Sequence, residues 1–271
     1  MSKSGLPEDG VVRLGSVLLP AGRRYFPTED APPGSSPGEA VAWVTDSPLP
    51  EAGRLWWVLS DLHAQTGLVP FLAGGPEDGI EYLFFTRFDV ARLDHMSAAD
   101  VLSGLWADDT PPDWDEWDAE DRAPFGRKFP GLAPGEGARL NPEPLAAAVD
   151  SLAAAEDSPG PFRIGLTVAR RPADVLPAIG WLVTDAEHPD ALEVAAVLRS
   201  WEDRFGARLV QFGPPGTIKL LVERPPRTFE TALALAAEHY MLCHQSQLVE
   251  HSVAAIAEAL VGAPIWRLWW D

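Results

Sequence analysis

The sequence is poor in cysteine, in lysine and in long apolar runs. Its single cysteine, Cys243, excludes a disulfide within the chain and is typical of a protein from a reducing compartment. The apolar run near the N-terminus, Val17-Leu18-Leu19, is far too short for a signal peptide or a membrane span. We therefore expect a cytoplasmic protein that does not enter a membrane.

Basic residues are scarce overall. The 271 residues include 21 Lys and Arg against 40 Asp and Glu, a formal net charge of -19. A field of this sign repels phosphates, so we expect no binding to nucleic acid through overall charge. The remaining expectations are a basic protein partner, cations, or simple solubility. Only three lysines occur, Lys3, Lys128 and Lys219.

The acidity is concentrated in the first part of the chain. Residues 1–157 hold 27 acidic and 11 basic residues, whereas residues 158–271 hold 13 and 10. Between them, residues 153–161 are rich in alanine, proline and glycine, a composition that favours a linker. The sequence thus predicts an acidic N-terminal α+β region over 1–157 and a C-terminal domain over 158–271. With 46% hydrophobic residues, both parts can be globular.

The N-terminal half reads as irregular. Its patterns predict strands, helices and a Pro/Gly/Ser-rich loop, the helix over 52–65 being closed by Gly67. The expected strands are 11–19, 40–45, 68–72 and 80–88; the expected helices are 52–65, 97–106 and 142–155; the loop is 27–38.

The C-terminal half is more regular and predicts the order β-α-α-β-β-α-α-β. Such an order favours an α+β sandwich with its helices on one face. The helix over 189–205 should bury Trp201 and Phe205, leaving Glu202, Asp203 and Arg204 as a solvated face. The other expected elements are a strand 162–169, a short helix 172–180, a hairpin 208–222, helices capped by Thr228 and Ser252, and a strand 265–270.

Several short segments of this half resemble a known family. They are Ser200 to Gly206, Ala237 to Tyr240 with Cys243, Ala259 to Gly262, and Trp266 to Asp271. Together they are similar to the DUF4253 type of C-terminal domain, an uncharacterised bacterial family common in actinobacteria. Members of that family continue after the cysteine with a Pro-Asp pair, where this chain has His244-Gln245. The resemblance covers about 158–271 and carries no activity with it.

A group of nitrogen and sulfur donors lies close together in the sequence. His239 and Cys243 are one helical turn apart, and His244 and His251 follow. Such donors suit zinc, and Cys243 with His239 also suits a nucleophile and its base. The spacing matches no standard zinc module, and no cysteine-enzyme signature surrounds Cys243. A buried structural cysteine is the other interpretation, and the sequence predicts neither a metal nor a cofactor.

The segment from Trp106 to Asp121 is the most unusual stretch. It holds eight acidic residues and no basic one, with Trp114 and Trp117 interleaved. The spacing is not that of a calcium loop. One hypothesis is a surface that docks a basic partner, and the other is a solvated loop whose tryptophans fold back. The binding candidates are Trp114, Trp117, Asp113, Asp115 and Asp118.

No complete catalytic set appears, so the sequence favours a protein that is not an enzyme. The leading hypothesis is a cytoplasmic protein-interaction protein, inhibitory or immunity-like toward a basic partner. The alternative is an enzyme or metal-dependent protein that uses His239 and Cys243 in a cleft between the two halves. A third option is a purely structural module.

Overall fold

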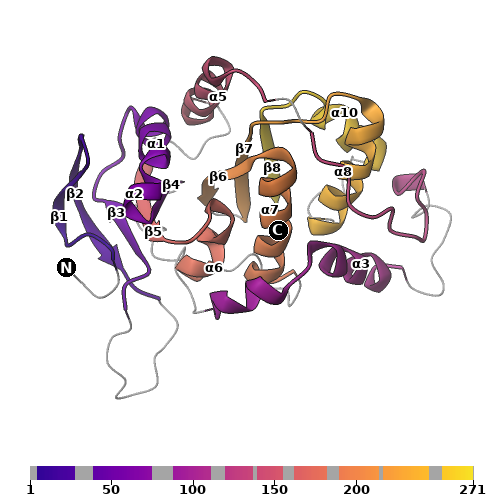
Figure 1. Cartoon of the computed structure of the whole chain (residues 1–271), viewed down its shortest axis with the longest axis horizontal. Coiled ribbons are helices and arrows are strands. Elements are labelled where there is room, and N and C mark those ends of the chain that lie inside the picture. The colour runs from indigo at the N-terminus through magenta and orange to yellow at the C-terminus, as the bar shows by residue number, and fades with distance from the viewer. Residues whose placement is uncertain are drawn as a thin grey trace.

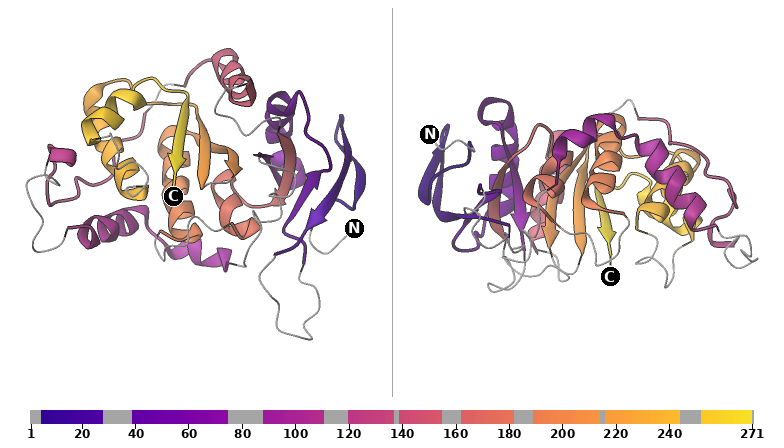
Figure 2. Two further views of the ribbon diagram at one scale, coloured as in Figure 1. Left: turned by 180° about the vertical axis from the view of Figure 1, so that it is seen from behind. Right: turned by 90° about the horizontal axis from the view of Figure 1, so that it is seen from below.

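The computed structural model describes most of the chain. The described residues are 5–27, 39–74, 88–110, 120–136, 139–154, 162–181, 189–213, 216–243 and 252–270. They form a single eight-stranded mixed sheet with helices on both faces (Figures 1 and 2), which confirms the predicted α+β class. No described helix has the length and apolar character needed to cross a bilayer.

The strands run in the order β1-β2-β3-β5-β4-β6-β7-β8, and every neighbouring pair is antiparallel except β4 and β6. They are β1 (Gly10–Leu14), β2 (Val17–Tyr25), β3 (Ala42–Thr45), β4 (Leu68–Ala73), β5 (Arg163–Val168), β6 (Ala207–Gly213), β7 (Thr217–Val222) and β8 (Ile265–Trp269). The helices are α1 (Ala52–Asp61), α2 (His63–Thr66), α3 (Ala98–Asp108), α5 (Pro142–Ala154), α6 (Val175–Ile179), α7 (Ala191–Phe205), α8 (Phe229–Leu242) and α10 (Val253–Leu260), with the 3-10 turns η2 (Val90–His95) and η3 (Pro172–Asp174).

The sheet passes through both halves of the chain. Strand β5 lies between β3 and β4, and β4 continues the sheet to β6. All six residues of β4 are buried, as expected for a central strand. Its Pro70 pairs with Leu166 of β5, whereas pairing with β6 involves only Leu72 and Ala73, so the missing N–H of Pro70 costs no bond to β6. The predicted boundary at 157/158 lies outside the described residues and stays a prediction.

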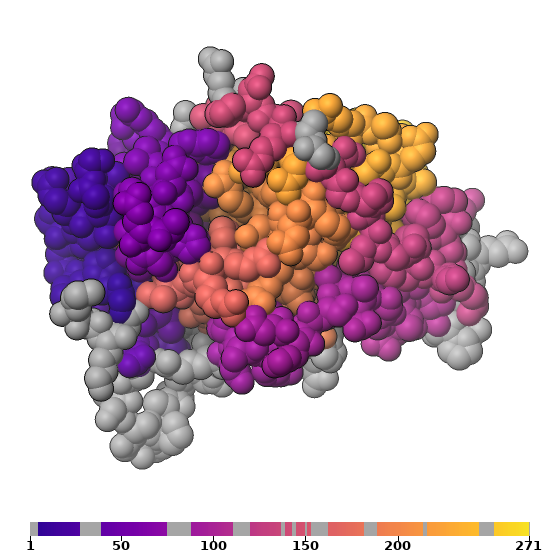
Figure 3. All heavy atoms as spheres, viewed as in Figure 1, coloured from indigo at the N-terminus to yellow at the C-terminus, as the bar shows by residue number. Residues whose placement is uncertain are grey.

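The two faces of the sheet carry separate cores. One face packs against α3, α6, α7, α8 and α10 around Trp201, Phe205 and Trp266. The other packs against α1 and α5 around Trp43, Trp56 and Phe162. The four C-terminal helices thus share a face as predicted, while α1 and α5 of the N-terminal half cover the opposite one. Figure 3 shows the segment that contains η2 and α3 lying directly against α7, consistent with the contacts between these elements.

Several predicted elements have different bounds. The strand expected over 11–19 is two strands, because Gly15 takes φ +57 and turns the chain between β1 and β2. The helix expected over 52–65 is broken at Leu62 into α1 and α2, and Gly67 ends it in the left-handed conformation as predicted. The strand predicted at 80–88 lies outside the described residues except for Phe88.

The C-terminal elements follow the predicted order. Thr228 and Ser252 accept backbone N–H groups at the starts of α8 and α10. Helix α7 begins one residue after Asp190, which forms a full capping box with Glu193, and ends at Gly206 with φ 65. Trp201 and Phe205 are fully buried, which confirms their prediction as core residues.

Candidate functional site

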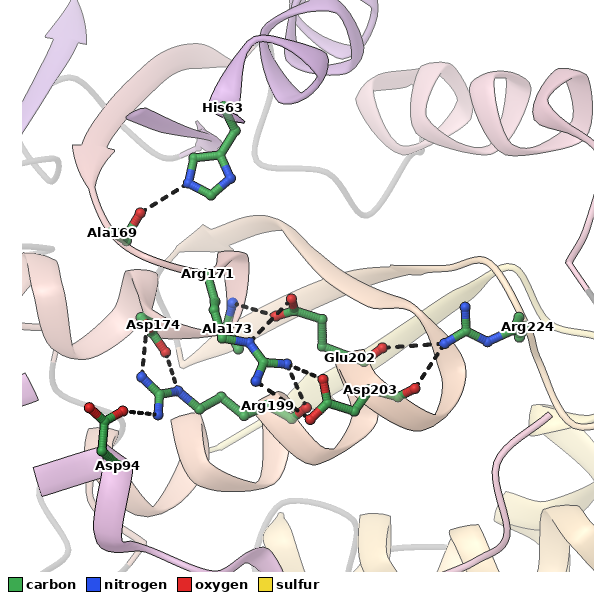
Figure 4. A network of polar contacts seen from close by, with 10 residues as sticks. All are labelled: His63, Asp94, Ala169, Arg171, Ala173, Asp174, Arg199, Glu202, Asp203 and Arg224. Atoms are coloured by element: carbon green, nitrogen blue, oxygen red, sulfur yellow. Dashed lines mark hydrogen bonds and ion pairs between the residues drawn. The ribbon is translucent and has the colours of Figure 1, made fainter. Parts of the chain in front are cut away.

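The polar side of α7 carries a network of arginines and carboxylates (Figure 4). Arg199 forms two bonds with the buried Asp174 of η3, Nε to Oδ1 at 2.6 Å and Nη2 to Oδ2 at 3.0 Å. Its Nη1 also donates to Asp94 of η2 at 3.0 Å. The bond with Asp174 is the main cause that raises the pKa of Arg199, and bonds from Arg199 and Arg170 lower the pKa of Asp94.

Arg171 makes a second set of contacts one turn further along α7. Its Nε donates to Glu202 at 3.3 Å and its Nη2 to Asp203 at 2.5 Å. The backbone N–H of Ala173 donates to the other oxygen of Glu202 at 3.3 Å. Burial raises the pKa of Glu202 above its ordinary value, although Arg171 acts in the opposite direction.

Arg224 caps the C-terminal end of α7. Arg224 donates to the backbone oxygens of Glu202 at 3.5 Å and Asp203 at 3.0 Å, where a helix leaves its last carbonyls unpaired. On the opposite side of Figure 4, His63 Nε2 bonds the Ala169 oxygen at 3.0 Å and thus ties α2 to the end of β5. Because each of the carboxylates Asp94, Asp174, Glu202 and Asp203 already faces an arginine, the network fastens η2 and η3 to α7.

These contacts correct one expectation for the surface of α7. The side chains of Glu202 and Arg204 are only 21% and 16% exposed, so they are not a solvated face. Asp203 is 68% exposed, yet it is paired with Arg171. Glu202 contacts η3 and Arg204 contacts α8, so these two elements cover the side of α7 that was expected to face solvent.

A buried carboxylate on α8 collects four hydrogen bonds. Glu238 is fully buried, and Arg204 binds both of its oxygens, at 2.8 and 2.6 Å. Trp201 Nε1 donates to it at 2.8 Å, and the backbone N–H of Ala133 at 2.7 Å. Arg204 also donates to the Ala133 oxygen at 2.8 Å. The cluster therefore joins α7, α8 and the segment around Ala133 at one point, and every lone-pair direction of the carboxylate is used.

His239, a candidate catalytic or metal-binding residue, is packed among aromatic rings. Its ring stacks on Trp201 with centroids 4.2 Å apart and meets Trp266 edge-on at 5.0 Å. Burial lowers its pKa to about 3, and the nearby charge of Arg204 adds to that effect. Its Nε2 is buried and has no hydrogen-bond partner among the described residues. The ring is therefore neutral at physiological pH and lies inside the core.

Cys243 ends α8 and is also buried. Its Sγ donates to the backbone oxygen of His239 at 3.1 Å, one turn back. The predicted partners His244 and His251 lie outside the described residues. Within the described part of the chain, no three or more His, Cys, Asp or Glu side chains gather so that they could hold a metal ion. The zinc and nucleophile hypotheses for His239 and Cys243 therefore stay predictions.

The acidic segment is anchored at both of its described ends. Trp106 is buried near the end of α3, and Arg122, directly after the segment, is also buried. Arg122 donates to the Thr110 hydroxyl at 2.6 Å and to both the side chain and the backbone oxygen of Asp109, the latter at 2.6 Å. Its guanidinium lies over the Trp106 ring at 4.9 Å and over Tyr240 of α8 at 5.9 Å. The candidates Asp113, Trp114, Asp115, Trp117 and Asp118 lie outside the described residues.

Fold and contacts define a mixed α+β protein in which arginine–carboxylate clusters join the C-terminal helices to the N-terminal half. Residues 163–271 match the family described as "Domain of unknown function (DUF4253)", so the chain contains a DUF4253 domain there. The match agrees with the resemblance found over about 158–271. Separate comparisons with curated proteins and with solved structures found no match.

Sequence reasoning missed three buried charged residues. Asp174, Glu238 and Arg122 are at most 1% exposed, and none was singled out as a site. A signal existed for Glu238, since it is an acid within the largely apolar run of α8. Arg122 is the first base after eight acids. For Asp174 we find no comparable signal, because it reads as an ordinary helix-start residue.

Proposed function

We propose that this chain is a cytoplasmic protein-interaction protein that binds a basic partner, in an inhibitory or immunity-like role, through its acidic segment 106–121. The observation that carries the proposal is the anchor made by Arg122 with Asp109 and Thr110. Arg122, which follows the segment, is thus bonded to Asp109 and Thr110 near its start, next to α3 and α8. The segment itself holds eight acids together with Trp114 and Trp117.

Electrostatics supports a basic partner. A local excess of acids over bases creates a negative potential that speeds encounter with a basic surface. Exposed ion pairs add little to affinity, so tight binding also needs desolvated anchors. Trp114 and Trp117 are the residues in this segment that can supply them. The resemblance to an actinobacterial family leads us to infer a source of that kind.

The test is capture of partners from native cytoplasm by the full chain and its variants, followed by binding kinetics with a captured protein. Charge removal by Asp113→Asn, Asp115→Asn and Asp118→Asn should slow association and weaken its salt dependence. Trp114→Ala with Trp117→Ala should instead speed dissociation. Replacing residues 112–118 by a Gly-Ser linker should abolish capture and leave folding intact, because Asp109, Thr110 and Arg122 remain.

A matched control removes the same charge elsewhere. Asp61, Asp100 and Glu258 are exposed acids, so Asp61→Asn, Asp100→Asn and Glu258→Gln together reproduce the change in net charge. If this control weakens binding as much as the segment variant does, overall charge and not the segment is responsible. Unaltered capture by the linker variant would refute the proposal, and a strongly destabilised Trp114→Ala, Trp117→Ala protein would place both rings in the core.

The enzyme or metal-dependent alternative is tested by metal analysis of the purified chain. No observation among the described residues favours it, since His239 is enclosed by Trp201 and Trp266. Stoichiometric zinc that disappears in Cys243→Ser would nevertheless replace the interaction proposal by this one.

A further inference from the structure

Residues paired across five neighbouring strands form one row that is apolar on β5 and β4 and polar on β6, β7 and β8. Backbone register places Ile164 of β5 beside Leu72 of β4, and Leu72 beside Gln211 of β6. Gln211 is then paired with Lys219 of β7, and Lys219 with Arg267 of β8. Side chains paired in this way share a face and lie roughly 5 Å apart. The last three residues thus form a polar row, defined here as Gln211, Lys219 and Arg267.

The polar row lies on the face opposite α7. Its neighbours Val210 and Leu221 belong to the core shared with α1 and α5, whereas Leu209 and Leu220 face the other core. In the left view of Figure 2, β7 and β8 are seen from the side away from α7. An irregularity in the pairing between Leu209 and Gln211 puts Val210 and Gln211 on the same side of β6. Bulges of this kind re-aim side chains and are frequent next to binding sites.

Burial makes the polar row unusual. Gln211 is 1% exposed and Lys219 is 5% exposed, on central strands where apolar side chains normally stand. Oε1 of Gln211 is buried and has no hydrogen-bond partner among the described residues. Leaving such an acceptor unpaired is costly, and glutamine is easily replaced by an apolar residue of similar size. A bound ligand that donates to Gln211 would remove this cost.

The positive charges of Lys219 and Arg267 indicate a second group on the ligand. Lys219 lies in register beside Gln211, and Arg267 lies in register beside Lys219, although lysine is rare in this acidic chain. Both bases also interact within the chain, so a ligand would join or exchange with those contacts. The two bases call for an anionic oxygen, and the glutamine carbonyl calls for an O–H or N–H donor beside it.

We infer that the polar row is a binding site for a small ligand that carries an anionic oxygen and an adjacent hydrogen-bond donor, with hydrogen phosphate as its simplest example. Lys219 and Arg267 bind the anionic oxygen, and Gln211 accepts the donor proton. The polar row lies on the face of the sheet opposite His239 and Cys243. It goes beyond the proposed protein interaction and does not depend on it.

Phosphate and sulfate provide the decisive pair of probes. They have nearly the same shape, but near pH 7 only phosphate keeps a P–OH group that can donate to Gln211. Isothermal titration of the full chain should show phosphate binding at least about tenfold tighter than sulfate binding, the size of effect expected from one unpaired buried acceptor. Gln211→Leu should remove that preference. Acetate, which has no donor near neutral pH, should behave as sulfate does.

Three charge variants locate the binding. Lys219→Gln should abolish binding of both ions, and Arg267→Gln, at the exposed end of the row, should weaken it without removing a buried side chain. Lys128→Gln is the matched control, because Lys128 is an exposed lysine elsewhere, and it should bind as the unmodified chain does. Phosphate binding weaker than about 1 mM, equal affinity for phosphate and sulfate, or unchanged binding in Arg267→Gln would each overturn the inference.

Discussion

The two faces of the sheet are built in different ways. The face covered by α7 and α8 takes its core from the DUF4253 domain and also from the N-terminal half, which contributes Leu102, Trp106 and Ala133. The face covered by α1 and α5 is supplied mainly by the N-terminal half, and on β6, β7 and β8 it also carries the polar row. Neither core is therefore formed by the DUF4253 domain alone, because both include residues of the N-terminal half.

Loss of Trp201 should have the largest effect on the α7 face. Trp201→Ala removes a fully buried indole that contacts His239 and Trp266 and donates to Glu238. We expect the free energy of unfolding to fall by about 3–5 kcal/mol, as measured by chemical denaturation. Trp57→Ala on α1, where the ring is half-buried, is the comparison and should cost clearly less. A loss below about 1 kcal/mol for Trp201→Ala would mean that this face does not depend on the helix as described.

Breaking the ion pair between Glu238 and Arg204 should have the next largest effect on the free energy of unfolding. Glu238→Ala leaves the half-buried Arg204 without its carboxylate and the Ala133 N–H without an acceptor. Uncompensated burial of this kind costs about 3–5 kcal/mol. Hydrogen exchange should rise first in residues 129–136, because Glu238 fastens them to α8. Glu258→Ala removes an exposed acid from α10 and serves as the control; equal losses in both variants would contradict the role of the cluster.

A smaller, pH-dependent effect should come from His239. Its folded-state pKa of about 3 lies below the ordinary 6.5 of an unfolded chain. Between these values the unfolded state binds a proton that the folded state rejects, so stability falls as pH is lowered from 6.5. One such group contributes at most about 1.4 kcal/mol per pH unit. Urea unfolding of His239→Phe from pH 7 to pH 5 should lose this slope relative to the unmodified chain; identical slopes would show that the ring is protonated when folded.

Cleavage between the two halves should have the smallest effect on structure. The sequence predicts a domain boundary within about 150–162, and limited proteolysis should cut there or within 107–123 and leave a stable C-terminal fragment. In the structure β5 pairs with β3 on one side and with β4 on the other. We therefore expect the cut fragments to remain together in size-exclusion chromatography. Elution of 158–271 as a separate folded monomer would show that the shared strands contribute little.

Local patterns were enough to predict most C-terminal elements. Apolar spacing and end signals located α7, α8, α10 and the β6–β7 hairpin, because caps such as Thr228, Ser252 and Gly206 act within a few residues of each helix end. Trp201 and Phe205 were predicted as core from the same periodicity. For the N-terminal half the patterns were less informative, and the continuous runs at 11–19 and 52–65 hid the turns at Gly15 and Leu62.

The amino-acid sequence by itself determined the α+β class, the acidity of residues 1–157 and the C-terminal order of elements, because each depends on composition or on contacts a few residues apart. Tertiary structure alone decided which distant residues meet. Glu238 with Arg204 and Ala133, Arg122 with Asp109, and Gln211 with Lys219 and Arg267 are joined by packing and strand register. A buried charge is stable only beside a suitable partner, and the choice of that partner is made when the sheet and its helices assemble.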